Sequence, residues 1–441
     1  MSDRAQMPVK EATTVGSHFV SNYPPYSFWT ADNAADARAA IDRAPRPGVP
    51  LGIYVHIPFC RKRCHFCYFK VYTDKDSSEI DQYLKALVSE LALYAGKPFI
   101  GGRSPSFIYF GGGTPSFLST RQLGQVVEAM KRVVNWDQAE EIAFECEPGT
   151  ITEGKLEILR AMGVTRLSLG IENFNEEILR SNGRAHGGKE IDKAYRAARS
   201  VGFPQINIDL IAGMMGETND NWRDCVRRTI ELSPDSVTIY QMEVPYNTTI
   251  FKDMKVFGQT EAPVADWATK REWVNYAFSE LEQAGYSIAS AYTAVKNPSA
   301  TRFLYRDLLW TGADMMGLGV ASFSHINGTH YQNEHDWEPY IEKVTQGILP
   351  VWRALTPNQE ERMIREFILQ MKLGHVDSGY FQQKFGVDVQ RRFDTPLKQL
   401  EEQGLLKLDA DTLRLSRDGL LRVDSLLHQF FLTEHRGVRA S

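Results

Sequence analysis

From Gly52 to about Tyr240 the chain alternates short apolar runs with longer amphipathic ones. The short runs are rich in β-branched and aromatic residues, whereas apolar positions in the longer runs recur at helical spacing. This alternation is typical of repeated βα units, whose strands pair in parallel. The runs that predict strands are Gly52–Ile57, Ser106–Phe110, Glu141–Glu145, Arg166–Gly170, Gln205–Leu210 and Ser236–Tyr240.

Helical runs separate these strands, and several of them begin at a capping residue and end at Gly or Pro. They are Ser78–Tyr94, Arg121–Val134, Glu153–Met162, Lys189–Val201 and Asn221–Leu232. Six units predict an α/β fold with a partial (β/α)6 barrel that resembles a TIM barrel. A seventh unit is expected, with a helix near Trp267–Ala284 and a strand near Tyr286–Tyr292.

The pattern differs at both ends of this barrel. Residues 1–49 show no sustained periodicity and are expected to form an arm; its aromatic stretch Tyr23–Trp29 favours docking on the outside of the core over covering a pocket. After about Thr356 two helical runs precede a hairpin (LLKLDADTLRLS), an order that resembles a winged helix. We therefore expect an arm at 1–49, the barrel at 50–290, a connecting and substrate-pocket segment at 291–355, and a winged-helix-like C-terminal domain at 356–441.

Composition narrows the class of partner. The 441 residues carry a formal net charge of −5, and the C-terminal segment is acidic with no basic stripe, so nucleic acid is not an expected partner. The wing is assigned a structural or substrate-covering role. No apolar stretch approaches the 18 residues or more of a membrane span, and a small-molecule substrate and a cytoplasmic location are expected.

Three of the five cysteines follow the first strand directly, as Cys60, Cys64 and Cys67 in a C-x3-C-x2-C spacing. Soft thiolates select iron–sulfur clusters or zinc, and a complete site of either kind generally has four ligands. A three-cysteine cluster site leaves one iron open for a ligand, at the barrel mouth where such folds carry their chemistry. The alternative is a structural zinc site with His56 or His65 as the fourth ligand; Cys146 and Cys225 are expected to be packed thiols.

A second motif, Gly111-Gly112-Gly113-Thr114-Pro115, follows the second strand directly. Consecutive glycines allow the backbone to approach a ligand that a Cβ would exclude, although a tight βα connection has the same composition. Polar residues then follow or end the later strands, and side chains at that end of a barrel are typically functional. They are Glu145, Glu172, Arg184 and Asp209.

At YVHIPFCRKRCHFC, GGGTP, FECEP, RLSLGIENF and NIDLI, the sequence resembles the radical S-adenosylmethionine (SAM) family that contains oxygen-independent coproporphyrinogen III oxidase. Relatives in that family include a heme chaperone branch and class C methyltransferases and cyclopropane-forming enzymes. The resemblance implies that the three cysteines hold a [4Fe–4S] cluster whose fourth iron binds SAM, and that reduction yields a 5′-deoxyadenosyl radical. It also implies SAM contacts at Tyr54, Phe66, Gly112, Gly113, Thr114, Glu145, Glu172, Arg184 and Asp209.

The resemblance further implies a second SAM beside the first in some members. Glu172 stands where the oxidase usually has Gln, and an added carboxylate near a sulfonium is electrostatically favourable. The stretch around Met242 and Glu243 also departs from the oxidase. A second SAM site in altered form is therefore a hypothesis for this chain.

Departures from the family pattern bear on the reaction. Tyr305 occupies the position of the heme-ligating histidine of the chaperone branch, with His325, His330 and His335 as substitutes, and Tyr68 replaces the Gly that follows the last cluster cysteine in the oxidase. Because loops decide substrate in a barrel, the leading hypothesis is methyl or methylene transfer from a second SAM to an unsaturated small molecule, that is, C-methylation or cyclopropanation. The alternatives are oxidative decarboxylation of coproporphyrinogen III and a non-catalytic heme chaperone.

Electrons are expected from outside the chain, because the sequence holds one cluster motif. Arg61, Lys62 and Arg63 are candidates for docking an acidic flavodoxin or ferredoxin by complementary charge. An ordinary solvated loop is the alternative interpretation of this basic triplet. Under the methyl-transfer hypothesis a partner methyltransferase is a further expected partner.

Overall fold

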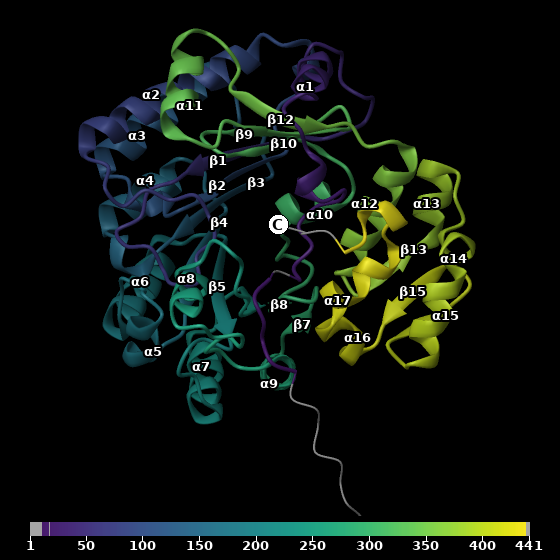
Figure 1. Ribbon diagram of the computed structural model, residues 1–441. Coiled ribbons are helices and arrows are strands. Elements are labelled where there is room, and N and C mark those ends of the chain that lie inside the picture. Colours follow the sequence, from purple (N-terminus) through teal and green to yellow (C-terminus); the bar gives the residue numbers. More distant parts are fainter. Residues whose placement is uncertain (1–10, 17, 438–441) are drawn as a thin grey trace, which may run out of the picture.

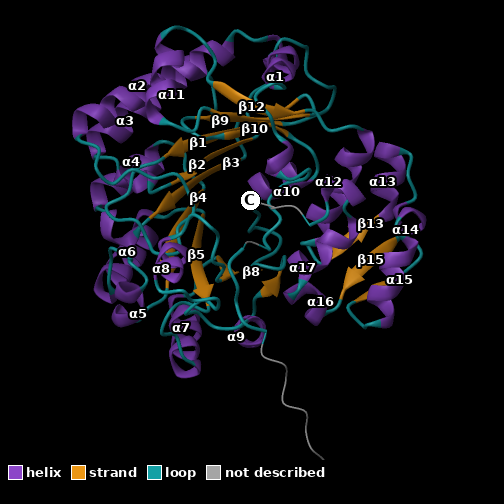
Figure 2. Cartoon of the chain, viewed as in Figure 1, coloured by secondary structure: helices purple, strands orange, loops and turns teal. Residues whose placement is uncertain are grey.

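The computed structural model describes residues 11–16 and 18–437. Within these residues one sheet of twelve strands forms the main body, and a three-stranded sheet belongs to the C-terminal domain. Figure 1 shows the large sheet curving around a central space, with helices on its outer side and the C-terminal domain, in yellow, facing its open side. Figure 2 shows the same layering of orange strands inside purple helices. The fold is the α/β barrel with an added helical domain that the sequence predicts.

The six predicted strands are present and lie side by side in chain order. Neighbouring strands pair in parallel, so their carboxyl ends all lie at the same mouth of the barrel. Their bounds differ from the predicted ones by at most two residues. The strands are β1 (Leu51–Ile57), β2 (Phe107–Gly112), β3 (Glu141–Cys146), β4 (Arg166–Glu172), β5 (Gln205–Ala212) and β6 (Ser236–Gln241).

The predicted outer helices also form, and local capping explains where several begin. Asp76 and Ser119 each make a capping box that satisfies the first backbone N–H groups of a helix. The helices are α2 (Ser77–Ala95), α3 (Thr120–Val133), α4 (Glu153–Ala161), α6 (Gly188–Val201) and α7 (Asn219–Leu232). The sequence patterns did not reveal two shorter helices, α5 (Glu176–Ser181) and α8 (Thr249–Val256).

The prediction of a seventh βα unit is confirmed for its helix and is wrong for its strand. Its helix is present as α9 (Trp267–Gln283), but the strand predicted at 286–292 is replaced by two short antiparallel strands, β7 (Ser287–Ile288) and β8 (Thr293–Val295). The chain turns back between them because the Ser290 hydroxyl accepts hydrogen bonds from the backbone of Tyr292 and Thr293. β8 therefore pairs antiparallel with β6, and the βα repeat stops there.

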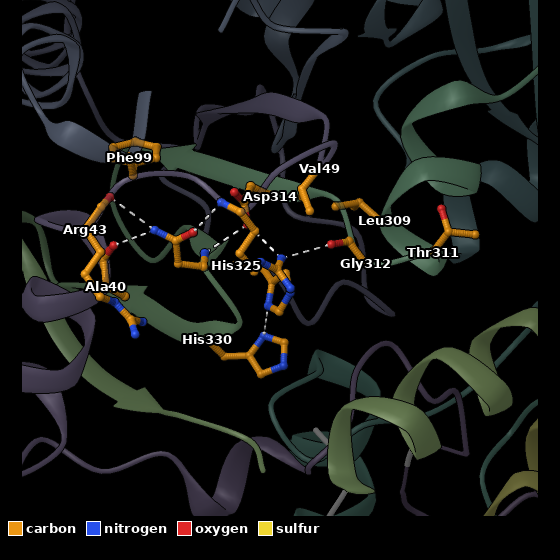
Figure 3. Close-up of polar contacts among 12 residues, drawn as sticks. Ala40, Arg43, Val49, Phe99, Leu309, Thr311, Gly312, Asp314, His325 and His330 are labelled. Carbon is orange, nitrogen blue, oxygen red and sulfur yellow. Dashed lines mark hydrogen bonds and ion pairs between the residues drawn. The ribbon is translucent and has the colours of Figure 1, made fainter. Parts of the chain in front are cut away.

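The segment expected to be a connection contributes further strands to the large sheet. β9 (Asp314–Leu318) adds a seventh parallel strand on the free side of β1, and β10 (Phe323–Ile326), β11 (Thr329–Asn333) and β12 (Val351–Leu355) continue as antiparallel strands. Two helices, α10 (Leu304–Trp310) and α11 (Trp337–Thr345), lie in the same segment. Fully buried Asp314, labelled in Figure 3, anchors it. Its carboxylate pairs with Arg46 at 3.1 Å and with Arg103 at 3.0 Å.

The C-terminal domain has the predicted order of helices followed by a hairpin. Its helices pack on an apolar core of their own, in which Phe367, Phe393 and Phe430 contact one another. A third strand that the sequence did not reveal joins the hairpin. The elements are α12 (Gln359–Met371), β13 (His375–Asp377), α13 (Ser378–Phe385), α14 (Val389–Arg392), α15 (Asp394–Glu402), β14 (Leu406–Leu408), β15 (Thr412–Leu415), α16 (Arg417–Leu421) and α17 (Val423–Leu427).

The N-terminal arm runs between the barrel and the C-terminal domain and ends in α1 (Ala34–Ile41), as the purple trace in Figure 1 shows. Two fully buried lysines hold it: Lys270 donates to the Thr13 hydroxyl at 2.7 Å, and Lys372 donates to the Val20 carbonyl at 2.6 Å. The prediction that the arm docks on the outside of the core is therefore wrong. No helix in the described part of the chain is long and apolar enough to cross a membrane.

Candidate active site

One cavity of about 1530 Å³ lies inside the curve of the sheet and is lined by the three cysteines and by all the predicted SAM-contact residues. Pockets for one drug-sized ligand span roughly 300–1,000 Å³, so this cavity has room for two such molecules. The predicted residues that line it are Tyr54, Cys60, Cys64, Phe66, Cys67, Gly112, Gly113, Thr114, Glu145, Glu172, Arg184 and Asp209. The fold brings them together from five different strands and loops.

The cysteine loop leaves β1 and is closed on itself by the backbone. Cys60 N–H donates to the Tyr72 carbonyl at 3.0 Å, and Tyr72 N–H donates to the Pro58 carbonyl at 2.7 Å. Polar neighbours hold two of the sulfur atoms: the Thr114 hydroxyl lies 3.3 Å from Cys60 Sγ, and Arg184 Nη1 lies 3.3 Å from Cys64 Sγ. All three thiols are partly exposed to the cavity.

The thiols fit an iron–sulfur cluster better than a single metal ion. Burial, and then the neighbouring cysteines, raise the pKa of Cys60 to about 12 and that of Cys67 to about 11, so thiolates here need bound cations to stay ionised. Among the described residues no three His, Cys, Asp or Glu side chains converge as one zinc ion would require. In a cluster each sulfur binds a different iron, so convergence on one point is not needed.

Neither histidine of the zinc alternative completes the cysteine set. His65 Nδ1 lies 3.0 Å from the Ser181 carbonyl, and His56 Nδ1 lies 3.3 Å from the Tyr54 hydroxyl. Burial lowers the pKa of His56 to about 4, so this ring is neutral in the ordinary pH range. Both histidines serve the structure of the loop and of β1.

The glycine motif is explained by close packing of backbone on backbone. A Cβ on Gly113 would lie 2.9 Å from the Phe59 carbonyl oxygen, and one on Gly112 would lie 2.5 Å from the His56 ring. Gly113 N–H donates to the Ile57 carbonyl at 2.9 Å, which fixes the turn against the start of the cysteine loop. The glycines thus set the position of Thr114, which reaches a cluster sulfur.

Three carboxylates face the cavity from β3, β4 and β5. Burial raises the pKa of Glu145 and of Glu172 to about 7, and it also raises the pKa of Asp209. Glu145 accepts a hydrogen bond from the Tyr109 hydroxyl at 2.6 Å, and Asp209 accepts one from the Ser168 hydroxyl at 2.8 Å. Glu172 lies 3.8 Å from Arg184, the one cation paired with any of the three in the described residues. This wall suits a ligand with positive charge.

Two residues of the predicted basic triplet, Arg61 and Arg63, form contacts that hold the cysteine loop. Arg61 bonds both carboxylate oxygens of Glu147, at 2.7 and 3.1 Å, and Arg63 donates to the Cys67 and Asn247 carbonyls at 3.1 and 3.3 Å. These contacts hold the cysteine loop, while Arg61 remains exposed and Arg63 is half-buried, so docking by the triplet stays a prediction. Exposed Lys62 has no such partner among the described residues.

Sequence patterns missed a second wall of the cavity. It is made by the arm, by β10–β12 and by α12, and its members include Tyr26, Trp29, Phe323, His325, His330, Arg353 and Arg365. The aromatic stretch of the arm and the histidines His325 and His330 were the signals in the sequence, because the other residues lie singly on elements far apart in the chain. Tyr305, noted for its place in the family pattern, contacts Tyr109 at 4.4 Å between tilted rings, beside Glu145.

Comparisons with known proteins agree with this geometry. Residues 54–229 match the Radical SAM superfamily, and residues 358–422 match the HemN C-terminal domain. The chain is 26% identical over 394 residues to oxygen-independent coproporphyrinogen III oxidase of Salmonella typhimurium, covering 86% of this chain and 85% of that protein. It is 28% identical over 373 residues to heme chaperone HemW of Bacillus subtilis, covering 83% and 96%. The solved structure of HemN from Escherichia coli, a radical SAM enzyme, matches with a TM-score of 0.79 and 26% identity over 95% of this chain and 99% of that one.

Proposed function

Because the chain belongs to the radical SAM family that contains oxygen-independent coproporphyrinogen III oxidase, we propose that it oxidatively decarboxylates a carboxylate-bearing, porphyrinogen-like small molecule. The family implies a [4Fe–4S] cluster and SAM as cofactors. The observation that carries the proposal is the single cavity, which joins the cysteine loop and the acidic wall to a second, aromatic and basic wall. One end suits SAM and the other suits an unsaturated acid.

The residues of the cysteine end have distinct tasks. Cys60, Cys64 and Cys67 would hold three irons of the cluster, while Thr114 and Arg184 donate hydrogen bonds to two of the sulfurs. When bound, the cluster supplies the electron that cleaves SAM to a 5′-deoxyadenosyl radical, which removes a hydrogen atom from the substrate. The chain itself provides orientation and exclusion of water.

The remaining SAM-site residues surround the same volume. Glu145 and Asp209 would face the amino and sulfonium groups of SAM, whose positive charge favours their ionised forms. Tyr54 stacks on Tyr109 at 5.9 Å, and the half-buried ring of Phe66 packs on an apolar cluster. These rings keep water away from a reactive radical.

A second SAM remains a hypothesis for this chain. Met242 belongs to the apolar cluster beside Phe66, whereas the Glu243 carboxylate accepts hydrogen bonds from the backbone N–H groups of His18 and Phe19, at 2.8 and 3.0 Å. Glu243 is therefore engaged by the arm, and Glu172 is the carboxylate we assign to the second sulfonium. Equilibrium dialysis of cluster-loaded protein counts the sites; saturation at one SAM per chain would exclude the second site.

The methyl-transfer hypothesis has less support than decarboxylation. The relatives described above are named oxidase or heme chaperone, and the second wall of the cavity carries arginines that suit an acid. Incubation of reduced enzyme with coproporphyrinogen III and methyl-deuterated SAM separates the reactions. Decarboxylation releases CO₂, forms a vinyl group, passes an electron to an added acceptor and leaves the methyl deuterium in methionine. Deuterium in the product or in deoxyadenosine would instead support methyl or methylene transfer.

A heme chaperone is the remaining alternative. The histidine that ligates heme in the chaperone branch is replaced here by Tyr305. His325 and His330 bond each other at 2.9 Å. Of the three substitute histidines, His335 is therefore the one with an exposed imidazole. A chaperone binds heme without consuming SAM in a productive reaction. Stoichiometric heme binding together with no CO₂ release would favour it over the proposed enzyme.

Electron delivery needs an external donor, and we place its docking site beside the cluster loop. Tyr68 and Phe69 directly follow Cys67, line the cavity, are 41% and 47% exposed, and stack on each other at 4.5 Å. Exposed Lys62 supplies positive charge in the same loop. This surface suits an acidic flavodoxin or ferredoxin.

A further inference from the structure

Arg365 is a buried cation on the second wall of the cavity with an unused hydrogen-bond donor. It extends from α12, is 6% exposed and lines the cavity. Its Nε donates to Asn22 Oδ1 at 2.6 Å and its Nη1 donates to the Leu309 carbonyl at 3.1 Å. No acceptor for Nη2 and no ion-pair partner occur among the described residues, because neighbouring Glu366 is bonded to Lys384 at 2.8 Å.

Arg353 on β12 repeats this arrangement. Its Nε donates to Gln332 Oε1 at 2.7 Å, and its Nη1 donates to the Tyr26 carbonyl at 3.2 Å. Again Nη2 has no acceptor, and no carboxylate lies within ion-pair distance, among residues 11–16 and 18–437. Burial lowers the pKa of both arginines, which expresses the cost of a desolvated cation without a counter-charge.

Two other arginines near this wall, Arg46 and Arg103, have a counter-charge. Figure 3 shows Asp314 at the centre of a polar cluster above the histidines His325 and His330. Its carboxylate pairs with Arg46 and Arg103 and accepts the Asn327 N–H at 2.9 Å. The Asp314 carboxylate is therefore engaged by two guanidinium groups and one backbone N–H. An unpaired charge shielded from water is unfavourable, and Arg365 is buried while Arg353 is half-buried, so a bound anion would relieve both free guanidinium edges.

Flat apolar surfaces lie beside these guanidinium edges. Tyr26 contacts Phe323 at 4.6 Å and Trp29 at 4.9 Å, and Trp29 lies flat on His330 at 5.3 Å with 9° between the rings. Burial lowers the pKa of His330 well below its usual value, so the ring presents a neutral surface. Rings of this kind receive the face of a planar unsaturated molecule.

We propose that Arg353 and Arg365 are the carboxylate-binding residues of the substrate site, each through its free Nη2, while Tyr26, Trp29 and Phe323 contact the planar body of the same molecule. The two walls of the cavity then have opposite charge: carboxylates where SAM would lie, and guanidinium groups where the acid would lie. The inference rests on the proposed function in assigning the acid as substrate. Its test needs only binding.

The test compares acids with their neutral esters on the full-length, cluster-loaded protein with SAM present. Coproporphyrin III and 1-pyrenebutyrate are titrated by fluorescence beside their methyl esters, on wild type, Arg353→Gln, Arg365→Gln, Arg353→Lys and Arg365→Lys. Arg362→Gln is the matched control, since Arg362 lies on the same helix but does not line the cavity. SAM affinity, measured in parallel, shows whether each variant is folded.

Wild type and Arg362→Gln should bind at least one acid more tightly than its ester. Each Gln variant should weaken acid binding on the order of ten-fold, with unchanged SAM and ester affinity. The Lys variants should recover part of the loss, because a point charge replaces the guanidinium fork. The proposal is overturned if wild type binds neither acid better than its ester, or if the Gln variants bind acid like wild type.

Turnover separates this proposal from the proposed function. Arginine-dependent acid binding without CO₂ release from coproporphyrinogen III would leave the carboxylate site standing and remove the decarboxylase assignment. CO₂ release with an unchanged KM in both Gln variants would leave the decarboxylase assignment standing and remove the carboxylate site.

Discussion

Arg184 joins the cluster loop to the acidic wall: its Nη1 lies 3.3 Å from Cys64 Sγ, and its Nη2 donates to the Gly170 carbonyl at 2.6 Å and lies 3.8 Å from Glu172. The guanidinium thus touches a cluster ligand on one side and a candidate SAM contact on the other. A single substitution here tests whether holding the cluster and binding SAM are separable tasks of the site.

Arg184→Gln should keep the cluster and weaken SAM binding on the order of ten-fold, because the three thiolates remain while a charged donor is lost. Iron and sulfide content and SAM affinity are measured on anaerobically loaded protein. Cys64→Ala should instead lose the cluster first, because one of its three protein ligands is gone. Cys225→Ala, at a buried thiol away from the loop, is the control that retains iron; equal iron loss in Arg184→Gln and Cys64→Ala would contradict the division of tasks.

The acidic wall predicts a pH dependence of stability. Burial raises the pKa of Glu172 from about 4.3 in an unfolded chain to about 7, so folding takes up a proton between these values. The contribution of Glu172 to the free energy of unfolding is complete below about pH 4.3 and is lost as pH rises through about 7. In protein free of cluster and SAM, the free energy of unfolding in urea of Glu172→Gln should be close to that of wild type near pH 4 and higher near pH 8, by on the order of 1–3 kcal/mol.

Exposed Glu177, nearby on α5, provides the matched control for this experiment. Glu177→Gln should follow the wild-type profile at every pH. A Glu172→Gln profile parallel to wild type would show that the carboxylate titrates normally in the folded protein.

Lys62 is the residue of the basic triplet that tests electron delivery, because Arg61 and Arg63 bind within the loop. Lys62→Glu should slow reduction by flavodoxin several-fold at low ionic strength and leave dithionite-driven SAM cleavage unchanged. Lys189→Glu, on the outer helix α6, serves as an equal charge change elsewhere. Equal slowing with both reductants would place the effect in the cluster itself.

The arm should loosen when Lys372 loses its charge. This fully buried lysine donates to the Val20 carbonyl and pairs with Asp424 at 2.8 Å. Lys372→Met leaves Asp424 without its cation, and breaking such a buried pair costs about 3–5 kcal/mol. Hydrogen exchange should rise around Val20.

Lys398→Met removes an exposed pair with Asp394 and should cost less than about 1 kcal/mol, with no change at the arm. Unaltered exchange at Val20 in Lys372→Met would mean that the arm is held by its aromatic contacts alone.

Much of the barrel and of the cysteine end could be predicted from the sequence, because both depend on residues that lie close together in the chain. Each parallel strand is a short apolar run between helices with their own capping residues, and Cys60, Cys64 and Cys67 lie within eight consecutive positions. Carboxyl ends of parallel strands share one mouth, so Glu145, Glu172 and Asp209 had to meet there. The failed strand at 286–292 shows the limit, since one serine hydroxyl turned the chain back.

The second wall was decided by tertiary structure. Arg353 and Arg365 lie on a strand and a helix of different domains, and each is oriented by the arm, through the Tyr26 carbonyl and Asn22, more than 300 positions earlier in the chain. No local pattern records such a contact, because hydrogen bonds between distant segments depend on how whole domains pack. The sequence by itself therefore determined where a radical would be made, whereas only the packing of the arm between barrel and C-terminal domain decided what surface faces it.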